Sequence, residues 1–253
     1  MRGLAFAAMS QRAKLLIAGG VVVAIVIGGG LWWFLRDDAP DEVSLDAAVD
    51  QVTDDTATDA TDTSAAASGI EGTWTVDTET GVFDFETASG TFAGFRVQEE
   101  LSTIGSATAV GRTGDISGSF AIEGTTVTEA EFEVDLSTLT TNESRRDSRV
   151  QDALETDQFP TATFTLTEPL DLGDETADGE AVSVTATGDL TIHGVTAAVE
   201  FPLEAQLVDG TVVLVGSIDQ TLSGYDVEAP SSPVVLSISD EFTLELQFLL
   251  TAT

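Results

Sequence analysis

The sequence predicts an all-β domain, because apolar and polar residues alternate through most of its C-terminal part. Residues 129–136 show this most clearly, with an acidic residue at each odd position and Ala, Phe, Val or Leu at each even one. Residues 199–207 alternate in a similar way, and Asp209-Gly210 then turns the chain into the apolar run 212–215, which predicts a β-hairpin. Shorter alternating stretches lie at 74–76, 83–85, 116–122, 182–186 and 242–248.

About eight such strands can bury their apolar faces either by closing into a barrel or by packing as two sheets. The alternation by itself does not separate these two architectures. Residues 70–253 contain neither a second shift in composition nor a repeat of fixed period, so we expect them to form a single domain.

A candidate membrane span precedes this domain. Residues 15–35 form an uncharged, mostly apolar run, about as long as the roughly 20 residues that a helix needs to cross a bilayer. Basic residues lie before the run and acidic residues follow it, which predicts a cytoplasmic N-terminus (1–14) and an extracytoplasmic C-terminal domain. A cleaved signal peptide would have a shorter apolar core and a small-residue cleavage site, whereas bulky aromatic residues end this run. We therefore expect a single-pass signal anchor that is retained in the cell membrane.

The segment between this run and the domain, residues 36–69, is predicted to be a disordered acidic linker. It is rich in Asp, Thr and Ala, and no basic residue lies between Asp37 and Ser68. Such a composition buries too little apolar surface to offset the entropy of ordering the chain.

Residues 142–154 interrupt the β pattern and predict one short helix, with Asn142 as its candidate N-cap. Arg145, Arg146 and Arg149 lie here, in a chain whose net charge is −35. This concentration of positive charge makes the segment the candidate region for contacting an anion. Alternatively, the arginines neutralise neighbouring carboxylates on a solvated helix.

Several short motifs resemble those of the YceI family of polyisoprenoid-binding proteins. They are Leu136-Ser137-Thr138-Leu139 followed by Arg146-Asp147, the segment 159–164, the turn 188–196 and the segment 225–231. The similarity covers about residues 72–248 and leaves out the predicted membrane span and linker. One departure is that residues 90–111 hold Arg96 and two glutamates, where many relatives carry a histidine.

The resemblance implies an eight-stranded antiparallel lipocalin-like barrel that holds a long-chain isoprenoid lipid or quinone in its lumen. A barrel of this size is either filled by its side chains or just wide enough for one slender ligand. A mixture of small and large inward residues is compatible with both states. The candidate lumen contacts are Phe120, Phe132, Phe164, Ala186, Leu203, Leu244 and Leu246.

A polar head group would lie at the barrel mouth, with Arg145, Arg146 and His193 as candidate hydrogen-bond donors. For His193, which precedes Gly194 in a predicted turn, a structural role is the stronger alternative, since a turn histidine more often bonds the backbone.

The sequence offers little machinery for catalysis. It contains no cysteine, one histidine and no Gly-x-Ser-x-Gly motif, so we expect a binding protein rather than an enzyme, with no cofactor and no metal site. The 44 acidic residues against 9 basic ones argue against a nucleic-acid partner. The alternative function is a filled-core envelope interaction or stress-response module without bound lipid. The sequence does not indicate an oligomeric state.

Overall fold

The computed structural model describes residues 39–58, 70–78, 83–102, 105–173, 179–230, 233 and 235–253. All of them belong to one compact unit, Ala39–Thr253. The predicted N-terminal segment 1–14 and the predicted span 15–35 lie outside the described residues. Within the described ranges, no helix has both the length and the apolar character that a membrane crossing requires.

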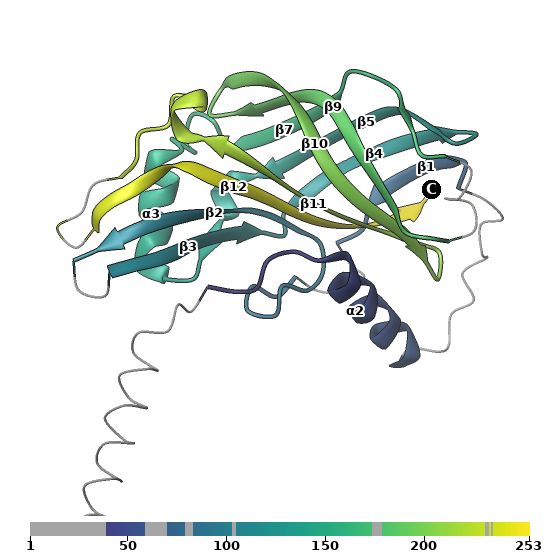
Figure 1. The fold of residues 1–253 in the computed structure, drawn as a ribbon, viewed down its shortest axis with the longest axis horizontal. Helices are drawn as coiled ribbons and strands as arrows, with labels where there is room; N and C mark the ends of the chain where they lie inside the picture. Colours follow the sequence, from purple (N-terminus) through teal and green to yellow (C-terminus); the bar gives the residue numbers. More distant parts are fainter. Residues whose placement is uncertain are drawn as a thin grey trace, which may run out of the picture. The chain divides into compact units, whose positions relative to one another are not determined.

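Eight strands pair edge to edge into a closed antiparallel barrel (Figure 1). β1 closes the ring, because it pairs with β4 along one edge and with the end of β12 along the other. The result confirms the predicted eight-stranded barrel and rules out two packed sheets. In order around the ring, the strands are β1 (Gly72–Val76), β4 (Ile116–Glu123), β5 (Thr126–Asp135), β7 (Thr161–Leu166), β9 (Val182–Ile192), β10 (Val195–Val208), β11 (Thr211–Thr221) and β12 (Val235–Ala252).

Two tight hairpins arise where the sequence supplies residues that tolerate positive φ. Asp209 and Gly210 have φ of 50° and 87° and join β10 to β11, with Val208 opposite Thr211. His193 and Gly194 have φ of 52° and 74° and join β9 to β10 in the same way. Two consecutive residues with positive φ match the right-handed twist of the flanking strands, which sets the register of both hairpins.

A second sheet region extends from β12. β2 (Phe92–Leu101) pairs with β12 on the same edge as β1 but nearer its start, and β3 (Gly105–Thr113) pairs with β2. Two short strands, β6 (Thr140–Thr141) and β8 (Leu170–Asp171), pair with β3 and β5. The alternation at 83–85 does not form a named strand; only an isolated bridge joins Asp84 to Ser89.

The predicted short helix is α3 (Ser144–Ala153), but its start differs from the expectation. Glu143 is the N-cap residue, and it makes no side-chain cap bond. Asn142 instead binds the edge of β3, where its amide donates to Thr108 O at 3.1 Å and its Oδ1 accepts from Val110 N at 3.2 Å. Asn142 therefore bonds the backbone at the edge of β3 instead of capping the helix. The described residues also include the 3₁₀ turns η1 (Leu136–Thr138) and η3 (Leu222–Tyr225).

The predicted linker contains a helix, α2 (Leu45–Thr58), so the expectation of disorder across 36–69 is wrong for these residues. Leu45, Ala48 and Val52 are buried and share one helical face. They pack against Val213, Val215 and Leu249 on the outer side of the barrel wall. Residues 39–58 are therefore part of the folded domain. Residues 59–69 of the predicted linker lie outside the described residues.

Candidate functional site

The barrel lumen contains two adjoining cavities with apolar walls. The larger has a volume of 210 Å³ and is lined by β2, β5, β7, β12, α3 and η3, among other elements. The smaller has a volume of 90 Å³ and lies among β4, β5, β9, β10 and β11. Both are bounded by the same four side chains, Phe132, Phe164, Leu203 and Leu214. These four residues, the waist, separate a large chamber from a small one.

Glycines in the neighbouring strands shape the waist. A Cβ atom added at Gly188 would lie 2.4 Å from Cζ of Phe164, and one at Gly118 would lie 2.7 Å from Cδ1 of Phe132. Since real Cβ atoms do not approach so closely, each ring occupies the space that a side chain would need. The rings thus lie against the wall over bare backbone, and less of their volume projects into the lumen.

All seven lumen residues named from the sequence line these cavities. Phe120 and Ala186 line the small chamber, Leu244 and Leu246 line the large one, and the remaining three border both. The strand alternation therefore assigned each of them to the correct face. Whether they contact a ligand stays a prediction.

One ion pair lies in the lining of the large chamber. Nη2 of Arg146, on α3, donates to Oε2 of Glu99, on β2, at 2.8 Å, and Nη1 donates to Oδ1 of Asn142 at 2.7 Å. The side chain of Glu99 is 5% exposed and that of Arg146 is 18% exposed. Nearby, Oδ1 of Asp147 accepts from the amide and hydroxyl of Thr141 and fixes the first turn of α3. A carboxylate and a guanidinium thus face a mostly apolar space.

The other two head-group candidates lie elsewhere. Arg145 is exposed on α3 and lines neither chamber. His193 also lines neither chamber: its Nδ1 lies 3.1 Å from the carbonyl oxygen of Tyr225, so this nitrogen donates. Its ring packs edge-on against Phe159 at 4.8 Å, and its Nε2 is 3.6 Å from Oε2 of Glu155. These contacts favour the structural role over the head-group role.

η3 covers part of the large chamber and is tied to the barrel by polar contacts. Leu222 and Tyr225 line the chamber, and Ser223 donates through its amide and hydroxyl to Asp240 at 2.9 and 2.7 Å. These two hydrogen bonds hold the pKa of Asp240 below its usual range. Burial raises the pKa of the Tyr225 phenol, whose hydroxyl donates to Gln220.

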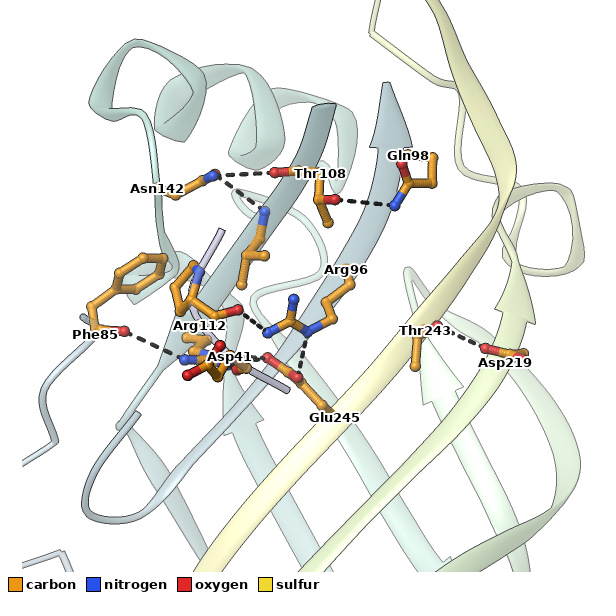
Figure 2. A network of polar contacts seen from close by, with 12 residues as sticks. Asp41, Phe85, Arg96, Gln98, Thr108, Arg112, Asn142, Asp219, Thr243 and Glu245 are labelled. Atoms are coloured by element: carbon orange, nitrogen blue, oxygen red, sulfur yellow. Dashed lines mark hydrogen bonds and ion pairs between the residues drawn. The ribbon is translucent and has the colours of Figure 1, made fainter. Parts of the chain in front are cut away.

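Directly outside the large chamber, the wall carries a buried charge cluster (Figure 2). Arg96 and Arg112 converge on the carboxylate of Glu245, with Nε–O distances of 2.8 and 2.7 Å. The two guanidinium groups also donate to the backbone carbonyls of Pro40 and Asp41. Arg112 is fully buried, with its guanidinium 4.6 Å from the ring centre of Phe92. The cluster binds the segment that leads into α2. The sequence did not predict this cluster.

These features define the structural class as a closed eight-stranded antiparallel barrel whose lumen contains two apolar chambers. Within that class, the family model described as the YceI-like domain matches residues 68–250. The chain belongs to the YceI family, as its motifs indicated.

Curated relatives match part of this chain. A UPF0312 protein of Pseudomonas putida is 34% identical over 109 residues, which is 42% of this chain and 53% of the relative. The chain thus spans about half the length of that relative. A UPF0312 protein of Shewanella denitrificans is 28% identical over 159 residues, covering 59% of this chain and 80% of the relative.

Among solved structures, a polyisoprenoid binding domain from Saccharophagus degradans, implicated in plant cell wall breakdown, has a similar fold. Its TM-score is 0.52 at 21% identity, over 64% of this chain and 94% of that one. At this level of identity the likeness concerns the fold.

Proposed function

We propose that this protein is a binding protein that holds a long-chain isoprenoid lipid, such as a polyprenol or an isoprenoid quinone, in the barrel lumen. The observation that carries the proposal is the pair of adjoining apolar cavities, at whose shared waist two aromatic rings pack against glycines on the neighbouring strands. A chain of isoprene units is slender and apolar, and each buried methylene contributes roughly 0.8 kcal/mol to binding. The solved neighbour described as a polyisoprenoid binding domain supports this ligand class.

The outer surface gives less support to the alternative, a filled-core interaction module. Among the described residues, the one large hydrophobic side chain that is strongly exposed is Leu236, at 65%. Interaction surfaces usually present a contiguous apolar patch rather than a single side chain. The cavities also leave space that a filled core would lack.

We further propose that residues 15–35 retain the protein in the cell membrane, with the barrel on the extracytoplasmic side. The support for this proposal is the length of the apolar run and the charge difference across it. Reporter fusions after residue 253, one active only in the cytoplasm and one active only outside it, test the orientation. Activity of the cytoplasmic reporter alone would contradict it.

The lipid-binding proposal is tested by native mass spectrometry and organic extraction of the full chain, purified from its own membranes in mild detergent. We expect an isoprenoid lipid in near-stoichiometric amount. A protein that emerges without lipid, and stays so after incubation with polyprenols and quinones, would favour the interaction module.

Adjacent residues on β7 provide a matched pair of variants. Phe164 faces the lumen at the waist, whereas Thr165 is exposed on the outside of the same strand. Phe164→Asp should abolish lipid retention because it places a charge in the apolar lumen, and Thr165→Asp should not. Ala162→Phe adds apolar volume to the large chamber without adding charge. If both lumen variants fold and retain lipid like the wild type, the lumen is not the binding site.

A further inference from the structure

We propose that the lumen selects isoprenoid lipids whose polar end is uncharged, and that Glu99 is the residue that rejects a phosphorylated end. This inference rests on the proposed function and specifies the ligand class for the same lumen. It follows from the charges that line the large chamber.

The lining of the large chamber contains three charged residues, Glu99, Arg146 and Glu245. Arg146 is paired with Glu99, and Glu245 is paired with Arg96 and Arg112 on the outer side of the wall. Each arginine at or behind this lining therefore already has a carboxylate partner. Among the residues that the structure describes, the lining offers no spare positive charge to an anion.

The remaining arginines of the domain do not supply this charge. Arg145 and Arg149 are exposed on α3, and neither lines a chamber. The chain as a whole carries a net charge of −35, so its overall field also opposes an anionic ligand.

A phosphate in the large chamber would compete with Glu99 for Arg146, either sharing the guanidinium with the carboxylate at close range or taking the place of the carboxylate in exchange. That exchange would leave a carboxylate that is 5% exposed without its ion-pair partner, next to a group carrying one to two negative charges. Breaking a buried pair on one side is strongly destabilising, because the remaining charge has lost its hydration without compensation.

An uncharged polar end avoids this penalty. Arg146 uses one donor for Glu99 and one for Asn142, whereas a guanidinium carries five N–H donors. A prenol hydroxyl or a quinone carbonyl can therefore accept a hydrogen bond from Arg146 while the ion pair stays intact. A hydroxyl can also donate to the carboxylate of Glu99.

The pair also ties α3 to β2, so the test has to separate charge selection from this structural contact. Glu99→Gln does so, because the glutamine side-chain oxygen still accepts from Arg146 while the negative charge is removed. Glu100→Gln is the matched control, since Glu100 follows Glu99 on β2, is exposed and lines neither chamber.

The experiment uses the full chain in mild detergent, stripped of lipid, with a polyprenol and a polyprenyl phosphate of equal chain length in direct competition. Native mass spectrometry gives the ratio of the two complexes. We expect the wild type to prefer the polyprenol at least tenfold, Glu99→Gln to shift the ratio at least tenfold towards the phosphate, and Glu100→Gln to keep the wild-type ratio.

Equal or preferred binding of the phosphate by the wild type overturns the inference, and this result does not depend on the folding of any variant. A ratio in Glu99→Gln that moves no further than in Glu100→Gln also overturns it, and would leave the pair with its structural role alone. Failure of both lipids to bind the wild type would instead refute the proposed function on which the inference rests.

Discussion

Replacing Glu245 by glutamine should destabilise the domain more than most single substitutions. Glu245 is 2% exposed and accepts from Arg96 and Arg112 through its two oxygens. Glutamine keeps the size of the side chain but can accept through only one oxygen. It also carries no charge to balance the buried guanidinium of Arg112 and the partly buried one of Arg96. Breaking a buried ion pair from one side costs about 3–5 kcal/mol. For a domain of this size, that loss lowers the Tm by about 6–20 °C.

The same substitution should also weaken the docking of residues 39–58. Glu245 orients the two guanidinium groups that donate to the carbonyls of Pro40 and Asp41. Hydrogen exchange in α2 should therefore become faster relative to the barrel strands. Thermal unfolding followed by circular dichroism measures the Tm, and hydrogen exchange with mass spectrometry measures the local effect.

Glu241→Gln is the matched control, because Glu241 lies four residues before Glu245 on β12 and is exposed. Its substitution should change the stability by no more than about 0.5 kcal/mol. If Glu245→Gln has a Tm within about 2 °C of the control, the cluster contributes little, and our account of how the outer wall holds residues 39–58 is refuted.

Three further predictions concern the waist and η3. Gly188→Ala should lower both stability and lipid binding, because its Cβ displaces the ring of Phe164 into the lumen; unchanged binding by titration would contradict the role of the glycine. His193→Asn keeps a residue that tolerates positive φ but loses the hydrogen bond to the Tyr225 carbonyl. The free energy of unfolding should therefore fall by about 1 kcal/mol, with lipid affinity unchanged. A large loss of lipid affinity would instead support the head-group role of His193. Burial raises the folded-state pKa of Tyr225, so the neutral phenol stabilises the folded state. This contribution is fully present below about pH 10, the ordinary pKa of tyrosine, and is lost as the pH rises through the folded-state pKa. Denaturant unfolding between pH 8 and 11 should show that the free energy of unfolding declines less steeply with pH in Tyr225→Phe than in the wild type. Equal slopes in the two proteins would contradict this role of Tyr225.

The strands were predictable where one face of the strand is buried and the other is exposed to solvent. Residues 129–135 lie in β5, as the alternation indicates, and the lumen residues were found by their alternation along such strands. The alternation at 83–85 is too short to specify pairing. Its aromatic side chains cover the outer wall instead. The ring centres of Phe83 and Phe92 are 5.8 Å apart, and the ring of Phe85 lies near the guanidinium of Arg112.

Glu99 was not predictable as a lumen residue. It stands in the polar run Gln98-Glu99-Glu100, which the sequence alone does not distinguish from an exposed strand end. Its burial depends on α3, which brings Arg146 to it from 47 residues away. A buried carboxylate needs such a partner, and only the fold supplies it.

The helix in the predicted linker left two signals in the sequence. The apolar residues of α2 recur at helical spacing, and residues 212–215 are apolar at every position, which is typical of a strand covered on both faces. The acidic composition of the segment itself obscures both signals. Its ordering depends on Val213, Val215 and Leu249, which share a surface only after β11 and β12 have paired.

The sequence by itself determined the features that depend on neighbouring residues: the strand alternation, the two-residue turns at 193–194 and 209–210, the short helix at α3 and the family motifs. Each follows from local backbone preference and from which face of an element avoids water. The tertiary structure alone decided that the barrel closes through β1, that four side chains divide the lumen into two chambers, that Glu99 meets Arg146 and that residues 39–58 dock on the outer wall. These outcomes depend on contacts between residues far apart in the chain, whose energies arise only when the barrel brings them together.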